Sequence, residues 1–303
     1  MTGALQNALI AARHPRNTLS YARCFGRLPD YVTPRTYSEK MQWRKLFDRR
    51  PLLITLCDKF AVRGFARSRS SEVKLPDLYW YGDDPDAIPW KSLRPPFVVK
   101  PNNRSGAWLF IRTDADFDVG LIKQRCREWL NSGSYGKHFC EWAYTRSKPL
   151  LLIEQFLSDS AELTLPPDFK VDVFAGRARQ ILLQDRGKGK RGMYTPDWEP
   201  LQLDRWKGGV RTGGYREIFQ PDVPCPRNLK GMIRIAEAIG RDIDYVRVDL
   251  YNFSGDIYLG EITAYPYSGR VTWMPKGTVF KRYPPRDFDY QLGELWTLPV
   301  TAN

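Results

Sequence analysis

Histidine is scarce in this chain, and long apolar runs are missing. Only His14 and His138 occur among the 303 residues, which argues against a zinc site or a histidine-based catalytic triad. Any metal chemistry would therefore have to use carboxylates. No stretch approaches the roughly 18 consecutive apolar residues that a membrane helix needs, so the sequence predicts no transmembrane segment.

The cysteines form no recognisable framework. There are five of them, they are widely scattered, and none has the C-x-x-C spacing of a metal site, so we expect free, reduced thiols. The N-terminal stretch MTGALQNALIAARHPRN places its charges after a short apolar run, whereas a secretory signal has them before it. Both features favour a cytoplasmic protein.

What the chain has in excess is positive charge. Its net charge is +13, and residues 1–50 hold ten lysines and arginines against three acids. Such a charge suggests an acidic partner: nucleic acid, an anionic membrane surface or a polyanionic substrate. A solvated helical face would explain the charge equally well. A chain of this length can form one large domain or two closely joined lobes.

Helical and extended segments alternate along the sequence. Apolar spacing predicts a helix over 37–50 with Ser38 as its N-cap, and further helices over 51–69, 118–133 and 229–243. Short strands are expected at 97–100, 108–112 and 150–157, hairpins at 168–185 and 245–263, and loops at 74–96 and 185–198, the last of them mobile. Because hairpins dominate the strand pairs, the pattern indicates an α+β fold with largely antiparallel sheets.

The predicted hairpin at residues 245–263, YVRVDLYNFSGDIYLGEIT, carries acidic residues within its strands, where acidic side chains are uncommon. With a three-residue loop at 254–256, Asp249 lies opposite Glu261 and Arg247 opposite Thr263, while the other face is apolar. Like charges directly opposite destabilise a sheet, and two carboxylates facing one point suit Mg²⁺. A surface hairpin with solvated acids beside an arginine is the alternative.

Two further segments carry charge in positions that suit a nucleotide. Lys100 ends a buried strand and precedes a small polar loop with Ser105 and Gly106; such a loop can hold phosphates, although it lacks the Walker pattern. A lysine at a strand end can also simply reach solvent. In DFKVD, alternation places Asp168 and Lys170 on one face of a strand.

The order of these motifs resembles the ATP-grasp fold. D-K occurs at 58–59, V-V-K-P-x-x-x-S-G at 98–106, L-I-E-x-F-L at 152–157, D-F-K-x-D at 168–172 and R-x-D…G-E-I-T at 247–263. The segments YSEKMQWRKLF and LCDKFAVRGFA are similar to the teichuronopeptide-biosynthesis (TupA-like) branch in particular. The resemblance covers about residues 35–275.

The resemblance implies a role for each matching position. A basic helical segment (1–55) would precede a small lobe (56–150) and a large lobe (151–303), the two lobes clasping ATP. The implied phosphate ligands are Lys59, Lys100, Ser105 and Gly106; the residues implied to line adenine or reach ribose are Glu154, Gln155, Phe156, Leu157 and Asp168; the implied Mg²⁺ ligands are Asp249, Glu261 and Thr263; and the implied catalytic cations are Arg247, Lys170 and Arg186, of which Lys170 would also meet the outer phosphates.

Two positions depart from the family's usual pattern. Thr263 stands where these enzymes commonly have asparagine, a better metal ligand, and Arg104 stands in the phosphate loop where small residues are frequent. Arg104 could add a phosphate contact or only change how the loop closes.

The resemblance implies an ATP-dependent carboxylate–amine ligase that forms an amide through an acyl phosphate. An acidic sugar, acidic peptide or small natural-product precursor would supply the carboxylate, and an amine co-substrate the nitrogen, in cell-surface polymer or secondary-metabolite synthesis. We expect no nucleic acid partner, leave open a peripheral membrane contact through the basic N-terminus, and make no prediction of the oligomer. The alternatives are a non-catalytic polyanion or nucleic-acid binder, or a kinase or glycosyltransferase with the same nucleotide site.

Overall fold

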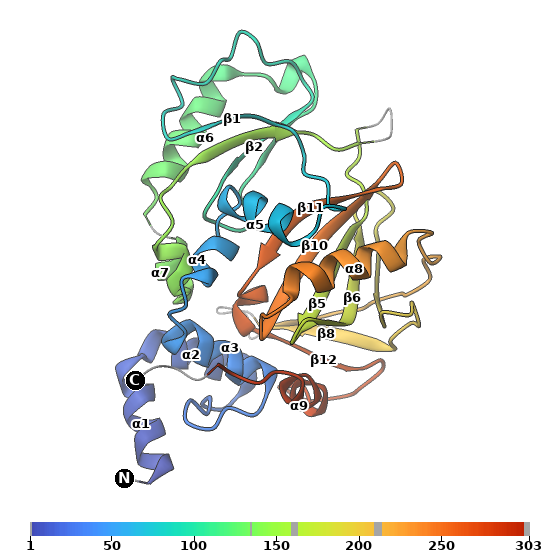
Figure 1. The fold of residues 1–303 in the computed structure, drawn as a ribbon. Coiled ribbons are helices and arrows are strands. Elements are labelled where there is room, and N and C mark those ends of the chain that lie inside the picture. The colour runs from blue at the N-terminus through green and yellow to red at the C-terminus, as the bar shows by residue number, and fades with distance from the viewer. Residues whose placement is uncertain (1, 134, 159–162, 209–213, 300–303) are drawn as a thin grey trace.

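A computed structural model describes residues 2–133, 135–158, 163–208 and 214–299. Its strands form three antiparallel sheets stacked along the molecule, as Figure 1 shows: a four-stranded sheet at the top, a five-stranded sheet in the middle and a three-stranded sheet below it. Helices from both ends of the chain lie together at the bottom of the same view. The α+β prediction with antiparallel sheets is therefore confirmed.

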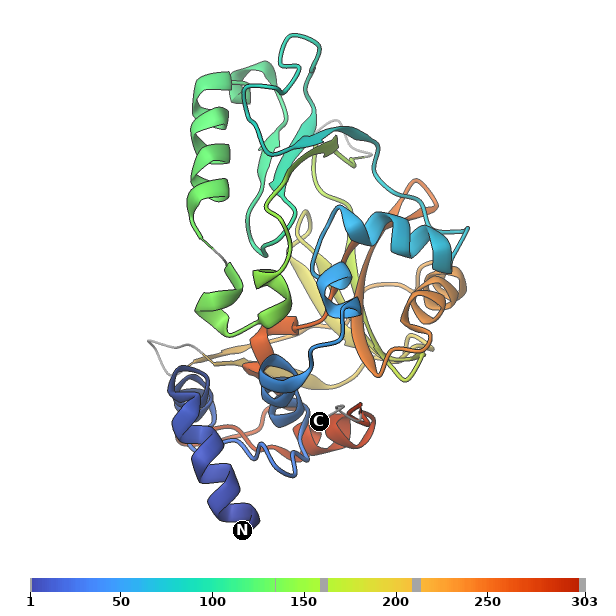
Figure 2. The ribbon, with the colours of Figure 1, turned by 60° about the vertical axis from the view of Figure 1, so that its left-hand side comes forward.

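The small lobe is built on the four-stranded sheet, in the order β1-β4-β2-β3. Its strands are β1 (Leu78–Gly82), β2 (Phe97–Pro101), β3 (Leu109–Ile111) and β4 (Leu151–Gln155). The amphipathic helix α6 (Val119–Asn131) covers one face with Ile122 and Cys126 (Figure 2). The expectation of loops throughout 74–96 missed β1. β4 pairs with β1 and β2, so the four-stranded sheet includes residues after 150, and the division into lobes at that residue stays a prediction.

The large lobe centres on the five-stranded sheet, in the order β11-β10-β5-β6-β7. Its strands are β5 (Asp168–Phe174), β6 (Arg177–Asp185), β7 (Lys190–Tyr194), β10 (Tyr245–Phe253) and β11 (Asp256–Thr263). Helix α8 (Leu229–Gly240) packs its apolar stripe on this sheet, and Gly240 permits the close approach because a Cβ there would lie 2.5 Å from Val173 Cγ1. β7 corrects part of the expected loop over 185–198, since five of those fourteen residues, Lys190–Tyr194, form a strand; the mobility of the segment stays a prediction.

The third sheet extends the large lobe. Its strands, in the order β12-β8-β9, are β8 (Leu203–Lys207), β9 (Tyr215–Glu217) and β12 (Val271–Pro275). Short helical turns connect the parts: η1 (Asp114–Asp116), α7 (Tyr135–Phe139), η2 (Trp142–Thr145) and η3 (Pro266–Gly269). Because η3 directly follows β11, it carries the chain from the end of the central hairpin to the third sheet.

The central hairpin keeps the expected register only near its acids. Asp249 pairs with Glu261 and Arg247 with Thr263, as predicted. The turn, however, has two residues and not three, since Phe253 pairs with Asp256. Gly260 is the extra residue that reconciles the two registers, and it forms a bulge between Glu261 and Leu259. The sequence reasoning chose a single register and therefore missed the bulge.

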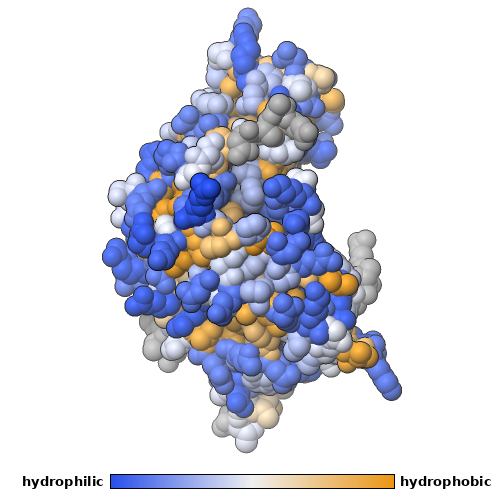
Figure 3. Space-filling view, turned by 90° about the vertical axis from the view of Figure 1, so that its right-hand side faces the viewer, coloured by the Kyte–Doolittle hydropathy of each residue, from blue (hydrophilic) through white to orange (hydrophobic). Residues whose placement is uncertain are grey.

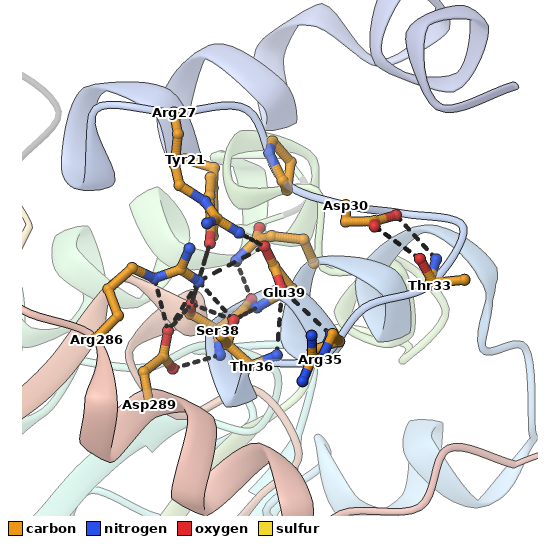
Figure 4. Close-up of polar contacts among 12 residues, drawn as sticks. Tyr21, Arg27, Asp30, Thr33, Arg35, Thr36, Ser38, Glu39, Arg286 and Asp289 are labelled. Carbon is orange, nitrogen blue, oxygen red and sulfur yellow. Dashed lines mark hydrogen bonds and ion pairs between the residues drawn. The ribbon is translucent and has the colours of Figure 1, made fainter. Parts of the chain in front are cut away.

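The N-terminal segment is held against the C-terminal helix. Its helices are α1 (Gly3–Arg13), α2 (Pro15–Phe25), α3 (Tyr37–Phe47), α4 (Leu52–Leu56) and α5 (Ala61–Arg69), and the C-terminal one is α9 (Asp287–Glu294). Thr36, not Ser38, caps α3 through a capping box with Glu39. Ser38 instead donates to Asp289 of α9 from its backbone N–H at 2.8 Å and its hydroxyl at 2.6 Å (Figure 4).

Some of the cationic side chains of residues 1–50 are buried inside the protein. Arg44 is wholly buried, with its Nη2 2.6 Å from Asp244 Oδ2, and Lys45 is 3 % exposed. Neither a solvated face nor a polyanion surface therefore describes α3. The arginines left exposed in this segment are Arg13, Arg16, Arg23, Arg27, Arg35 and Arg49, and peripheral membrane contact through them stays a prediction.

The outer surface is mostly polar. Charged and polar residues cover the greater part of the face in Figure 3, with apolar residues showing between them in separate areas. Within the described residues, no helix combines the length and the apolar character that crossing a membrane requires. All five cysteines are free thiols, as expected.

Candidate active-site cleft

A cleft of about 620 Å³ is lined by residues of the small lobe, of the five-stranded sheet and of β8 and β9. Thirteen of the residues singled out from the sequence line it: Lys59, Lys100, Ser105, Gly106, Glu154, Gln155, Leu157, Asp168, Lys170, Arg186, Arg247, Asp249 and Glu261. Phe156 is buried beside it, with its ring 5.5 Å from that of Phe110, and Thr263 lines an adjoining pocket.

Alternating buried charges lie along the floor of the cleft. Lys170 Nζ lies 2.5 Å from Asp168 Oδ2 and 2.6 Å from Asp249 Oδ2. Arg247 donates two hydrogen bonds to Asp249, from Nε to Oδ1 at 2.6 Å and from Nη2 to Oδ2 at 2.7 Å. The pairing of β10 with β5 sets Asp249 opposite Lys170, so the sheet register itself brings these charges together.

The surroundings fix the protonation of these groups. Burial would raise the pKa of Asp249, but Arg247 and Lys170 outweigh it and hold the pKa below its usual value. Burial would lower the pKa of Lys170, but Asp249 and Asp168 raise it well above the usual range. Asp249 is therefore an anion and Lys170 a cation at neutral pH. Burial raises the pKa of Asp168 against the pull of Lys170.

Glu261 is the more accessible of the two opposed acids, with 29 % of its side chain exposed. Its Oε1 lies 3.4 Å from Arg247 Nη2 and 3.3 Å from the hydroxyl of Thr263, and its Oε2 lies 3.9 Å from Lys59 Nζ. Burial lowers the pKa of Lys59, with Glu261 opposing that shift. The acid pair predicted from the hairpin therefore faces the cleft and is flanked by three cations.

The small lobe presents a second pair of charges to the cleft. Lys100 Nζ lies 2.5 Å from Glu154 Oε2, and Arg63 Nη1 lies 3.0 Å from Glu154 Oε1. The register of β2 with β4 sets Val98, not Lys100, opposite Glu154, so the long lysine side chain reaches along the sheet to the carboxylate. Arg63 has no counterpart among the predicted residues, because a helix position distant in sequence gave no signal for it.

The polar loop after β2 is shaped by a glycine with positive φ and by two side-chain hydrogen bonds. Gly106 has a φ of +71°, which glycine adopts at little cost. Lys59 Nζ donates to the carbonyl of Arg104, whereas the Arg104 guanidinium is 2.5 Å from the hydroxyl of Ser132, the C-cap residue of α6. Arg104, which departs from the family pattern, therefore bonds within the small lobe. The exposed Ser105 and Gly106 line the cleft.

More cations lie where the third sheet meets the cleft, and the sequence reasoning missed two of them. Arg205 of β8 is buried and bonds Glu217 at 2.6 Å through Nε, and Lys207 ends the same strand. Arg186, an expected catalytic cation, is exposed at the rim, 5.8 Å from the ring of Trp108. Only the packing of the third sheet brings Arg205 and Lys207 to the cleft, because in the sequence they sit in an ordinary basic strand.

The acids fit a divalent cation on their donor chemistry. Asp249 and Glu261 face each other across paired strands, and the buried Oδ1 of Asp168 has no hydrogen-bond partner. Among the described residues, no three His, Cys, Asp or Glu side chains gather closely enough to hold a metal by themselves. Mg²⁺ commonly takes one or two carboxylates and completes its shell with phosphate oxygens and water, so this pair is sufficient when a polyphosphate is present.

Comparison with known proteins gives a family and a set of distant structures. A model described as TupA-like ATPgrasp matches residues 39–295. An L-amino acid ligase from Bacillus licheniformis is 14% identical over 77% of this chain and 49% of its own, with a TM-score of 0.45. The ADP complex of purK, N5-carboxyaminoimidazole ribonucleotide synthetase, is 10% identical over 70% of this chain and 46% of its own, with a TM-score of 0.43.

The ATP-grasp ligase PsnB, complexed with its minimal precursor, is 11% identical over 81% of this chain and 60% of its own, with a TM-score of 0.40. The chain thus spans about half to three fifths of the length of these three structures. No curated protein matches the sequence.

Proposed function

Because the chain belongs to the TupA-like ATP-grasp family, we propose that it is an ATP-dependent carboxylate–amine ligase that forms an amide through an acyl phosphate. The observation that carries the proposal is the opposition of Asp249 and Glu261 at the floor of a cleft that also collects Lys59, Lys100 and Lys170. Acids that could hold Mg²⁺ and cations that could hold phosphates face the same space, which is what a nucleotide with its metal requires.

The residues divide the work of phosphoryl transfer. Lys59 and Lys100 would bind phosphate oxygens from the small-lobe side and Lys170 from the floor, each offsetting negative charge. Asp249 and Glu261 would hold Mg²⁺, which supplies charge neutralisation at the transferring phosphate. Arg247, fixed by its two bonds to Asp249, would stabilise charge that develops on the reacting carbonyl. Thr263 supports Glu261 by its hydroxyl and is better described as a positioning residue than as a ligand.

The adenine would lie against the small lobe beside Gln155 and Leu157, the two cleft residues that follow Glu154. Glu154 is already held by Lys100 and Arg63. Its pairing fixes the end of β4, so that the backbone after it is presented in one position. Phe156 contributes packing beneath this site and not a cleft surface.

The substrate that supplies the carboxylate would carry further negative charge, since cations gather at one end of the cleft. Arg186 and Arg191 line both the cleft and a basic surface pocket that also includes Lys188 and Lys190. An acidic sugar, an acidic peptide or a small acidic precursor would match this charge. Synthesis of a cell-surface polymer or a secondary metabolite is the setting that we propose for the reaction.

The proposal is tested by calorimetry of ATP binding with and without Mg²⁺. We expect Mg²⁺-dependent binding to the wild type and at least a tenfold weaker affinity for Glu261→Gln. Glu237→Gln in α8 is the matched carboxylate control, because Glu237 does not line the cleft. A screen of acids with amines then follows ADP and phosphate release. A stable phosphorylated product would indicate a kinase instead, and a protein that binds no nucleotide would contradict the ligase proposal.

A further inference from the structure

The first helix of the chain is attached to the molecule along one side only. Asn7 of α1 donates from Nδ2 to the carbonyl of Pro29 at 3.1 Å and accepts from the N–H of Tyr31 at 2.7 Å. The Thr18 hydroxyl of α2 donates to the carbonyl of Ala11 at 3.2 Å. These bonds fix which side of α1 faces the protein, and no residue of the helix is buried. In Figures 1 and 2, α1 forms an edge of the molecule, and its N-terminal end points away from the sheets.

The opposite side of α1 is exposed and apolar. Leu5 and Leu9 are four residues apart and therefore share one side of the helix, where they are 52% and 42% exposed. Ala8 and Ala12, which are also exposed, lie beside them. The first charged side chain of the sequence is Arg13, so this side carries no charge before the helix ends. A surface helix normally turns its apolar side toward the protein, whereas α1 turns it toward solvent.

The surface that continues from this side is cationic. Arg13 follows Leu9 by four residues and so lies beside it. Arg16, Leu19 and Arg23 share one exposed side of α2 by their spacing of three and four residues, and Leu19 is 52% exposed. The three arginines make no ion pair with any described carboxylate. Exposed leucines and unpaired arginines therefore meet at the junction of the two helices.

We propose that α1 and α2 dock the protein reversibly on an anionic lipid surface. The three exposed leucines would enter the outer part of the acyl layer, and the three unpaired arginines would lie among the headgroups. Interfacial helices bind membranes by this combination of apolar area and positive charge, and the negative surface potential of anionic lipids attracts each arginine. Asp30 is the only acid among residues 1–36, so little in this segment opposes that attraction.

Two other occupants would match only part of this surface. Nucleic acid would satisfy the arginines through its phosphates but would leave the leucines in water. A second copy of the chain, related by a two-fold axis, would cover the leucines but would bring the same arginines toward each other. A lipid surface accommodates both groups. The four- and five-stranded sheets, which line the cleft, lie above α1 in Figure 1, so docking keeps the cleft away from the lipid.

The test measures co-sedimentation of the full chain with lipid vesicles at low and at moderate salt. The vesicles are phosphatidylcholine alone and phosphatidylcholine mixed with phosphatidylglycerol. We expect the wild type to bind the anionic vesicles at least tenfold more tightly than the neutral ones. Leu5→Ser combined with Leu9→Ser should weaken binding to the anionic vesicles at least tenfold. The combination Arg13→Gln, Arg16→Gln and Arg23→Gln should weaken it at least tenfold at low salt and remove most of its salt dependence.

Matched controls carry the same changes elsewhere on the surface. Leu121→Ser replaces a leucine of α6 that is 65% exposed. A second control lowers the net charge as much as the arginine variant does, at exposed arginines that likewise make no ion pair with a described carboxylate: Arg67→Gln, Arg227→Gln and Arg241→Gln. Both controls should bind vesicles as the wild type does.

A wild type that does not bind anionic vesicles, or binding that the leucine variant leaves unchanged, would overturn the proposal. Equal losses in the arginine variant and its control would assign the binding to net charge and would overturn it too. Sedimentation velocity without lipid checks the second copy, because a dimer that the leucine variant dissociates would give the surface to another protomer. None of the substituted residues lines the cleft, so ATP affinity should stay unchanged and the outcome is independent of the ligase proposal.

Discussion

Buried charges are arranged differently in the N-terminal segment and in the cleft. Between α3 and its neighbours, Arg44 is matched by Asp244 and by the carbonyls of Tyr245 and Ala264 at 2.9 and 3.1 Å. Arg286 likewise bonds Asp289 at 3.1 Å and the Thr36 hydroxyl at 2.6 Å (Figure 4). In the pocket that adjoins the cleft, by contrast, Arg270 and Lys207 make no ion pair with any described carboxylate.

Arg44 and Arg286 form ion pairs that link distant parts of the chain, whereas Arg270 and Lys207 have no ion-pair partner in the described part of the chain and are available to a ligand. A network of ion pairs offsets much of the desolvation of its members within the fold, so removing one member leaves its partners uncompensated. A cation at a pocket that has no ion-pair partner in the chain leaves no carboxylate uncompensated when it is removed, so its removal should cost little stability. Substitutions in the two regions should therefore fall on different observables, stability in the first and binding in the second.

The largest effect is expected from Arg44→Met. The side chain is wholly buried and pairs with Asp244 while lying 4.4 Å from the ring of Trp296, so its loss should lower the free energy of unfolding by about 3–5 kcal/mol. Urea denaturation measures this. Arg50→Met is the matched control, because Arg50 bonds the same carboxylate from a side chain that is 33% exposed, and it should cost about 1 kcal/mol or less. Equal losses would contradict the comparison.

Stability should next respond to pH through Glu141. Burial raises its pKa to about 7, above the usual value near 4.5, so the folded protein holds the proton more tightly than the unfolded chain does. The contribution to stability is complete below about pH 4.5 and is lost as pH rises to about 7, an effect on the order of 2–3 kcal/mol. Glu141→Gln should lack this decline, and denaturation from pH 4 to 8 measures the difference.

A pH dependence that is the same in Glu141→Gln and in the wild type would assign the proton to another group. Glu237→Gln serves as the control again, because it removes a carboxylate from the half-buried surface of α8 and should leave the wild-type profile intact.

Lys100→Met should act mainly on binding. Its partner Glu154 keeps a bond from Arg63 at 3.0 Å, so we expect a stability loss below about 1 kcal/mol. ATP affinity should fall about tenfold, equivalent to about 1.4 kcal/mol, because a phosphate contact is lost. Calorimetry and urea denaturation of the same variant give both values. A loss of stability without a loss of affinity would give Lys100 a structural role like that of Arg44.

The smallest effect is expected from Gly260→Ala, at the bulge beside Glu261. A Cβ there would lie 3.0 Å from the Tyr251 ring and 3.2 Å from the carbonyl of Asp249, so the strands must shift slightly, at a cost of about 1 kcal/mol. Because the shift moves Glu261 relative to Asp249, Mg²⁺-dependent ATP affinity should fall too. Gly255→Ala, in the turn with a φ of +83° and open space around it, should cost similar stability and leave the affinity unchanged.

Local patterns in the sequence predicted much of the cleft. The alternation of DFKVD and of YVRVD fixed which side chains share a face, since successive residues of a strand point to opposite sides. The opposition of Asp249 and Glu261 followed from the need to keep the apolar face of the hairpin together. The same rule could not reveal the bulge at Gly260, because a register change leaves both faces correctly polar or apolar on either side of it.

The sequence by itself determined the fold class, the antiparallel pairing of the acids and the order of motifs that identifies the family, because each depends on residues close together in the chain or on their order. Only the tertiary structure decided which cations are paired. Arg44 and Arg270 are both arginines in basic or aromatic surroundings, yet Arg44 pairs with Asp244 across 200 residues, whereas Arg270 makes no ion pair with a described carboxylate. Coulomb energy and desolvation depend on distances in space, and separation along the chain does not give those distances.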